Sequence, residues 1–479
     1  MANTEFCCRS GGSNLNAGSR SGGSTIPGTS ADFTYASGTW VQSTRVFTVA
    51  SGNPSTDGVA VGDFVSIYPD GSSVTPYVVR VTAVSSTTIT TSSTALIGTA
   101  PVDGTSNRTC KVGGAWKGPN GTDFFPFNVI NYTLTNVAGD LPRVNMKKDA
   151  TYSVTSSITH ANHAVVFEGF NAAYADKGLA KIDGGTASSY TLLTVSGNTN
   201  AFKYIEFTNN CATGSSGLVN SSSYFNTYAN CIFHDCRGFG LRLAQFSSLA
   251  IECEAYNCNK NNTGSSGGFQ HTGGYGNSFV SCIAHHCAGL GFVASANVNP
   301  CLFLNCIASD ITAGTSQGYG FYGNESGTMF HGCDAYNCAS HGIYVSQDTG
   351  HNGFTLIQNC NLLKNGGWGV YIFGAGLKQV TFRNCGFGSG SMANTSGTYS
   401  GNTNEALDMV TYASGVTPWV DPTQGNFAIA LDAAKNVGRR AFTITDTGHW
   451  SATTTGNADI GSAGHLADGG IVPSQVQCS

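Results

Sequence analysis

A phrase built around a cysteine recurs through the second half of the chain. The copies are "YANCIFHDC", "AIECEAYNC", "FVSCIAHHC", "FLNCIASD", "FHGCDAYNC", "IQNCNLLKN" and "FRNCGFGSG". Each copy follows the previous one after 22 to 29 residues, and the first cysteines are Cys231, Cys253, Cys282, Cys306, Cys333, Cys360 and Cys385. A second phrase, in which glycine precedes an apolar residue, alternates with the first and carries Leu241, Phe269, Phe292, Phe321, Ile343 and Val370.

Two interleaved phrases that advance together by about 25 residues predict a solenoid, in which equivalent residues of successive coils stack directly on one another. The phrases are rich in glycine and β-branched or aromatic residues, which excludes helical repeats. The predicted fold is therefore all-β, a parallel β-helix in which loops of varying length account for the uneven spacing.

The cysteine phrase also predicts a bend in each coil. An apolar residue lies three positions before the cysteine and another lies two positions after it, yet strand alternation sends positions three apart to opposite faces. Both can point inward only if the strand bends between them. Asn230, Asn305, Asn359 and Asn384 occupy that place in four coils, and asparagine tolerates the left-handed conformation that a bend requires.

The cysteines admit three interpretations. We predict that they pack in the core, because a thiol is small and is among the side chains most often buried. The same applies to the second column, which contains Cys236, Cys258, Cys287 and Cys338. Disulfides between stacked cysteines are a less favoured alternative. So is zinc bound by Cys282, His285, His286 and Cys287, because sister coils keep the cysteines without the histidine pair. We predict no metal and no cofactor.

The composition limits the classes of partner that the chain is expected to bind. Only 10% of the 479 residues are charged and the formal net charge is −5, which gives no general reason to bind nucleic acid or an anionic membrane. No apolar run reaches the length of a membrane span, and the first residues do not resemble a signal peptide. The 17 cysteines are then expected to be thiols of a chain made in a reducing cytosol.

The predicted domains follow from changes in pattern along the chain. Residues 1–38 form a Gly/Ser-rich arm that orders only against a partner, and 39–112 form a small antiparallel β module resembling a barrel. Residues 113–390 form the β-helix with an N-terminal capping helix, and 391–479 form a closing segment. The helix is expected to carry Phe124, Phe125, Phe127, Val129 and Ile130. The pattern leaves open the state of Cys7, Cys8, Cys110 and Cys478. Cys7 and Cys8 could cross-link subunits from a mobile arm, but we favour an unpaired, inert pair.

With its coils, bend asparagines and glycine-led strands, the chain resembles the right-handed parallel β-helix superfamily, whose type members are pectate lyases. The resemblance covers roughly residues 113–470 and includes "PRVNMKKDATYSVTSSITHANHAVVFEGF" as first coils and "PWVDPTQGNFAIALDAAKNVGRR" as closing segment. A small β module before a β-helix, without a signal peptide, is similar to phage virion proteins such as tailspikes, fibres and capsid decorations. The resemblance implies fold more than activity.

Function on a solenoid belongs to its outward side chains. In the glycine-led phrase, the outward positions of three neighbouring coils should form an aromatic patch of Tyr319, Tyr322, Tyr344, Trp368 and Tyr371, with His341 beside them. Such a patch on a monomer calls for an explanation. It could stack on sugar rings, form an interface with another protein, or lie under loops of the same chain.

Catalysis has weaker support in the sequence. Glycoside hydrolysis needs two carboxylates about 5–10 Å apart, and Glu325 and Asp348 follow outward strands of neighbouring coils, with Asp310 as a third candidate. We interpret them first as solvated turn residues, because the catalytic motifs of polygalacturonase-type β-helices and a dense calcium-binding aspartate cluster are both missing.

The leading hypothesis is a structural virion protein of a bacteriophage, located in the particle and acting in assembly or host-surface contact. Its partners would be other virion proteins, further copies of itself in a homo-oligomer such as a trimer, and a surface glycan. The alternatives are a polysaccharide depolymerase, hydrolase or lyase, with Glu325 and Asp348 as acid and base, and a secreted bacterial surface adhesin.

Overall fold

The computed structural model describes residues 4–19, 27–68, 76–103, 108–120, 122–123, 125–128, 142–149, 151–174, 176–185, 190–209, 217–260, 266–295, 300–314, 317–323, 327–346, 354–373, 379–388, 393–396, 405–407, 410–412, 419–421, 426–429, 442–444 and 450–452. Contacts divide the chain into two units. The first contains residues 1–209 and 229–231, and the second contains residues 210–228 and 232–479. The strand β18 (Thr227–Ala229) lies at the boundary.

The first unit contains an antiparallel module with the strand order β2-β8-β5-β6-β7-β4-β3. Its elements are β2 (Phe33–Tyr35), β3 (Gly38–Val41), β4 (Val46–Val49), α1 (Pro54–Asp57), β5 (Phe64–Tyr68), β6 (Tyr77–Val84), β7 (Thr88–Ile97) and β8 (Thr109–Val112). Alternating apolar residues such as Trp40, Phe47 and Ile67 fill its core. The predicted barrel-like module is confirmed.

The first coils of the β-helix also belong to this unit and place strands in three parallel sheets, named sheets 1, 2 and 3 here. Sheet 1 contains β1 (Thr4–Cys8), β9 (Pro142–Lys147), β12 (Val166–Phe170) and β15 (Ala201–Lys203). Sheet 2 contains β10 (Thr151–Ser153), β13 (Ala180–Asp183) and β16 (Ile205–Thr208), and sheet 3 contains β11 (Ile158–His160) and β14 (Leu193–Val195).

The N-terminal arm, predicted over residues 1–38, is corrected at both ends, because β2 (Phe33–Tyr35) already belongs to the antiparallel module. Residues Thr4–Cys8 form β1, which pairs in parallel with β9 and so covers a strand edge that would otherwise be open. Phe6 is fully buried and its ring stacks on that of Trp116 at 4.7 Å. Cys7 and Cys8 are also buried, and burial raises the pKa of Cys7 to about 12, so neither thiol is placed to cross-link subunits.

The predicted capping helix is also corrected, because Phe125–Asn128 form a turn. Proline disfavours the helical conformation in the residue before it, and Pro126 directly follows Phe125. Phe127 still covers the core, since its ring stacks on Phe167 at 4.3 Å and its carbonyl lies 2.7 Å from His160 Nδ1. Phe124, Val129 and Ile130 lie outside the described residues.

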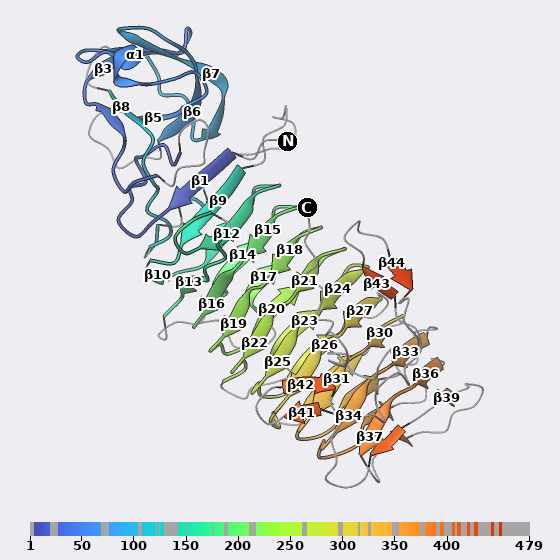
Figure 1. Cartoon of the computed structure of the whole chain (residues 1–479). Coiled ribbons are helices and arrows are strands. Elements are labelled where there is room, and N and C mark those ends of the chain that lie inside the picture. Colours follow the sequence, from blue (N-terminus) through green and yellow to red (C-terminus); the bar gives the residue numbers. More distant parts are fainter. Residues whose placement is uncertain are drawn as a thin grey trace. The chain divides into compact units, whose positions relative to one another are not determined.

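The second unit stacks further coils rung upon rung (Figure 1). Sheet 1 contains β21 (Leu249–Ile251), β24 (Asn277–Val280), β27 (Cys301–Leu304), β30 (Met329–His331), β33 (Phe354–Gln358), β36 (Gln379–Arg383) and β39 (Glu405–Leu407). Sheet 2 contains β19 (Ile232–His234), β22 (Glu254–Tyr256), β25 (Ile283–His285), β28 (Ile307–Ser309), β31 (Asp334–Tyr336), β34 (Asn361–Leu363), β37 (Gly386–Gly388) and β40 (Val410–Tyr412).

Sheet 3 of this unit carries the glycine-led phrase. Its strands are β17 (Gly217–Ser221), β20 (Phe239–Leu243), β23 (Gly267–His271), β26 (Leu290–Ala294), β29 (Tyr319–Gly323), β32 (Ile343–Ser346), β35 (Val370–Phe373) and β38 (Ala393–Ser396). The closing segment contributes β41 (Trp419–Asp421), β42 (Asn426–Ile429), β43 (Phe442–Ile444) and β44 (Trp450–Ala452).

The predicted bend is confirmed. Asn230, Asn305, Asn359 and Asn384 all have φ between 50° and 56°. Nδ2 of Asn384 donates to Oδ1 of Asn359 at 3.4 Å, so these two bend asparagines also bond along the stack. The residue in the left-handed conformation turns the chain from a strand of sheet 1 into a strand of sheet 2. The apolar residues before and after it can then both point inward.

The cysteines line the core as predicted, and every cysteine of the described chain is buried. Each thiol of the first column bonds one coil back. For example, Cys306 Sγ donates to the Phe279 carbonyl at 3.3 Å and Cys333 Sγ to that of Phe303 at 3.4 Å. Cys110 is buried in the antiparallel module, and Cys478 lies outside the described residues. No described helix has the length and apolar character of a membrane span.

Candidate functional site

Five of the predicted outward residues meet on sheet 3 of the second unit. Tyr322, Tyr344 and Tyr371 are register partners on β29, β32 and β35, and alternation turns their side chains away from the core. Tyr319 and His341 reach the same face from the preceding glycine-led corner. We call Tyr319, Tyr322, His341, Tyr344 and Tyr371 the aromatic ladder.

The glycine between Tyr319 and the inward Phe321 explains this placement. A Cβ atom on Gly320 would lie 3.0 Å from Ala335 Cβ and 3.1 Å from Cys338 Sγ, two core atoms. The glycine position therefore faces inward and allows close packing against sheet 2. Tyr319, one residue earlier, faces outward beside Tyr322, and Gly342 plays the same part next to His341.

The ladder rings stack on one another. Their centroids lie 4.4 to 6.3 Å apart, with Tyr319 on Tyr344 at 4.5 Å and His341 on Tyr371 at 4.4 Å. The planes lie within 31° of each other. Phe373 extends the ladder, with its centroid 6.2 Å from that of Tyr344, and is half exposed. Because the ring faces are largely occupied by neighbouring rings, edges and phenol oxygens form much of the outward surface.

Three side chains of the ladder, Tyr319, His341 and Tyr344, are held uncharged near neutral pH. Burial raises the pKa of Tyr319 and Tyr344, with neighbouring tyrosines adding to the effect, and burial lowers the pKa of His341. Nδ1 of His341 accepts a hydrogen bond from the Trp368 amide at 3.0 Å, which assigns its ring proton to Nε2. A neutral ring surface suits an uncharged or hydroxyl-rich partner.

Trp368, the sixth predicted residue, is half-buried one coil beyond His341 and joins the ladder through that backbone bond. In the coil before β29, the equivalent outward positions carry apolar residues that are buried. Leu290 and Val293 form a buried cluster with Phe239, and Tyr319 and Tyr322 pack against it. On sheet 3, the outward aromatic face of the ladder thus begins at β29.

Of the three carboxylate candidates, the structure describes Asp310. Asp310 follows β28 on sheet 2, away from the sheet that carries the ladder. It adopts φ 52° and accepts a hydrogen bond from Asn337 Nδ2 at 2.6 Å. Its geometry is that of a turn residue stacked along the coils. Glu325 and Asp348 lie outside the described residues.

The sequence interpretation missed a second aromatic stack. The rings of Tyr224, Phe246 and Tyr275 stack at 5.4 and 5.5 Å, and both tyrosines are exposed. These residues lie seven positions before Cys231, Cys253 and Cys282, respectively. That constant offset was a usable pattern, which the search for apolar residues close to the cysteines passed over.

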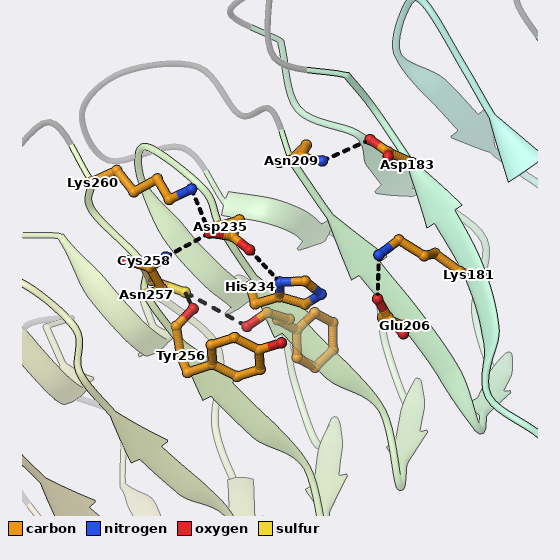
Figure 2. A network of polar contacts seen from close by, with 11 residues as sticks. Lys181, Asp183, Glu206, Asn209, His234, Asp235, Tyr256, Asn257, Cys258 and Lys260 are labelled. Carbon is orange, nitrogen blue, oxygen red and sulfur yellow. Dashed lines mark hydrogen bonds and ion pairs between the residues drawn. The ribbon is translucent and has the colours of Figure 1, made fainter. Parts of the chain in front are cut away.

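A polar network on sheet 2 was also missed. Figure 2 shows Lys260 and Asn257 pointing at Asp235, with His234 on its other side. Nδ1 of His234 lies 2.6 Å from Asp235 Oδ2, and the ring of Tyr256 stacks on that of His234 at 4.5 Å. Burial opposes ionisation of Asp235, yet the bonds from Lys260 and His234 lower its pKa. The charges therefore compensate one another locally.

Comparison with known proteins identifies the fold. Residues 303–408 match the family model described as the right handed beta helix region, and together with the parallel strand order this confirms the predicted right-handed parallel β-helix. No curated protein sequence matches the chain significantly.

Solved structures of similar architecture include enzymes and phage proteins. Pectate lyase Pel9A is 17% identical with a TM-score of 0.47, over 72% of this chain and 95% of the lyase. The enzymatically active domain of tailspike protein 2 from bacteriophage CBA120 is 10% identical with a TM-score of 0.41, over 74% of this chain and 55% of that one. Tailspike protein gp49 from Pseudomonas phage LKA1 is 10% identical with a TM-score of 0.25, over 80% and 66%. Likeness at this level concerns the fold alone.

Proposed function

We propose that this chain is a structural protein of a bacteriophage particle, a spike, fibre or decoration, whose β-helix contacts a host-surface glycan through the aromatic ladder. The observation that carries the proposal is the ladder itself, five half-buried stacked rings on three successive coils. The phage assignment rests on the order of domains, a small β module followed by a β-helix.

The periodicity of the ladder favours a glycan over a protein partner. Equivalent rings recur at each coil of a parallel sheet, about 4.8 Å apart, and a repeating surface complements a repeating polymer better than an irregular protein surface. The phenol oxygens can hydrogen-bond with sugar hydroxyls, while the ring edges contribute apolar contact area. The neutral state of Tyr319, Tyr344 and His341 avoids the desolvation of charge on binding.

A contact role fits these side chains better than a hydrolytic one. Hydrolysis needs two carboxylates flanking the bond, whereas the ladder consists of tyrosines and a histidine, and Asp310 lies beside sheet 2, where it bonds to the side-chain amide of Asn337. The depolymerase hypothesis becomes the better one if the purified chain releases oligosaccharides from host polysaccharide and Glu325→Gln or Asp348→Asn abolishes the release.

The glycan contact is tested by binding the purified chain to polysaccharide from the host surface. Tyr322→Ala and Tyr344→Ala should each weaken binding at least tenfold, because truncation of an aromatic side chain at the centre of a contact costs about 2 kcal/mol or more. Phe354→Ala is the matched control, since Phe354 is an exposed aromatic residue on sheet 1. Equal losses in all three variants would contradict the proposal, and binding to a virion protein instead would reassign the ladder to assembly.

The attachment role of the antiparallel module is tested by an internal deletion. Removal of residues 1–112 would also remove β1, which pairs with β9. The Asp32 amide, however, donates to the Val112 carbonyl at 2.9 Å, so residues 33–112 can be replaced by a short linker that leaves β1 in place. The shortened chain should fold and assemble as the same homo-oligomer, expected to be a trimer, yet be absent from purified particles. Its incorporation at the normal copy number would refute the assignment.

A further inference from the structure

The histidine pair His285-His286 is left unexplained by the ladder. The two cysteines that flank it, Cys282 and Cys287, are fully buried, whereas His285 is half-buried and His286 is exposed. The cysteines and histidines therefore lie on opposite sides of the coil wall, which rules out one zinc ion held by all four. The histidines nevertheless lie together on the outside.

The left-handed backbone conformation of His286 brings its ring to the same side of the coil as the ring of His285. Consecutive strand residues point to opposite faces, but His286 has φ 51° and ends β25 in a turn. As a result, Nδ1 of His285 and Nδ1 of His286 lie 2.8 Å apart. The ring planes are nearly perpendicular, at 85°.

The ring of His285 is held in place from two directions. It stacks on Tyr256 with centroids 5.3 Å apart, and its Nε2 lies 2.8 Å from Glu254 Oε1. A carboxylate accepts hydrogen bonds, so the Nε2 atom carries the proton and the Nδ1 lone pair faces His286. A carboxylate bonded to the far nitrogen is also the usual orienting partner of a metal-binding histidine.

We propose that Glu254, His285 and His286 form a binding site for a divalent transition-metal ion, with the two Nδ1 atoms as ligands and Glu254 as the orienting residue. The ion takes the place of the proton shared between the two Nδ1 atoms, and His286 then carries its proton on Nε2. Water or an external ligand completes the coordination, because the described residues hold no group of three or more His, Cys, Asp and Glu side chains around one point.

The distance between the two Nδ1 atoms indicates which coordination geometry, and therefore which ions, the site suits best. With metal–nitrogen bonds of about 2.0–2.1 Å, ligands at a right angle lie about 2.9 Å apart and tetrahedral ligands about 3.3 Å apart. The 2.8 Å observed is the length of the hydrogen bond between the two rings, so a right angle requires the nitrogens to part by about 0.1 Å and a tetrahedral angle by about 0.5 Å. The site is thus suited to Ni²⁺ or Cu²⁺ and less suited to Zn²⁺ in tetrahedral geometry.

The proposal is tested by calorimetric titration of the full chain, without an affinity tag, with NiCl₂ and separately with ZnCl₂. Nickel is the better probe because it does not oxidise the thiols as copper does. We expect one equivalent of Ni²⁺ to bind, more tightly than Zn²⁺, and this binding to disappear in the double variant His285→Ala/His286→Ala. Nickel bound equally by wild type and double variant would overturn the proposal, and tighter binding of Zn²⁺ would overturn the right-angle geometry.

The orienting role of Glu254 is tested with a charge-matched pair of variants. Glu254→Gln should weaken nickel binding by about 10- to 100-fold, as loss of an orienting partner does. Glu252→Gln removes the same charge two residues earlier and should leave the affinity within about twofold. Ile283→Ala, on the same strand and exposed, reports on any general disturbance of β25. Equal losses from both glutamine variants would show a long-range charge effect and refute the role of Glu254.

Discussion

Replacement of a bend asparagine by alanine and by glycine separates two contributions to the stability of a coil. Asn359 is buried, adopts φ 56° and accepts the hydrogen bond from Asn384 Nδ2. Both variants lose that bond, which costs about 1–3 kcal/mol because a buried donor loses its partner. Alanine is also strained at positive φ and should cost about 1 kcal/mol more than glycine.

The expected loss is therefore about 2–4 kcal/mol for Asn359→Ala and about 1–3 kcal/mol for Asn359→Gly. The coil-opening equilibrium should be about fivefold more favourable in the alanine variant than in the glycine variant, since 1.4 kcal/mol is a factor of ten. Coils of a solenoid contact only their neighbours. The effect should consequently be concentrated in the peptides that contain β33, β34, β36 and β37.

Hydrogen exchange followed by mass spectrometry measures this opening peptide by peptide. Exchange in residues 354–363 and 379–388 should accelerate, while residues 232–243, several coils away, should exchange as in the wild type. The bend argument is refuted if the glycine variant is destabilised as much as the alanine variant. Uniform acceleration along the chain would refute the local, coil-by-coil account of stability.

Three further results are expected. Gly320→Ala should lower the unfolding free energy by about 1–3 kcal/mol through overpacking, because its Cβ would lie 2.8 Å from the Gly342 carbonyl oxygen; an unchanged thermal midpoint would contradict the inward glycine column. Burial lowers the pKa of His160, so below pH about 6.5 the unfolded chain binds a proton that the folded chain does not, and the free energy of unfolding falls as the pH drops. Urea unfolding at pH 7.5 and 5.5 should therefore show a smaller loss of unfolding free energy for His160→Gln than for the wild type. Cys110 and Cys306 are buried and their pKa values are raised by burial, so iodoacetamide should label them only after denaturation, and rapid native labelling would disprove their enclosure.

The β-helix could be predicted because its determinants lie close together in the sequence. A left-handed bend depends on one residue and its neighbours, and Asn305 and Asn384 occupy it as expected. The inward cysteine follows at a fixed distance, so its burial in each coil follows from the same pattern. The ladder tyrosines could be assigned to one face for a similar reason. Because the coils stack, residues at the same position within successive repeats lie above one another.

Other features were not predictable from local pattern. The strand β1 appeared as part of a Gly/Ser-rich arm because its partner Pro142–Lys147 lies about 140 residues later. The capping helix had suitable apolar spacing, but Pro126 and the packing of Phe127 on Phe167 produced a turn. In the same way, the spacing around Cys282 and Cys287 could not show that both intervening histidines lie on the outside, because His286 departs from strand alternation at φ 51°.

The sequence by itself determined the coil repeat, the bend, the inward columns and the outward position of the aromatic residues. Each of these depends on backbone preferences and apolar spacing within a single coil. Only the tertiary structure decided that β1 covers β9, that the ladder rings stack face to face, and that Glu254 meets His285 from the preceding coil. Those contacts join residues that the chain brings together only when it closes its turns, so their geometry depends on the folding of the whole unit.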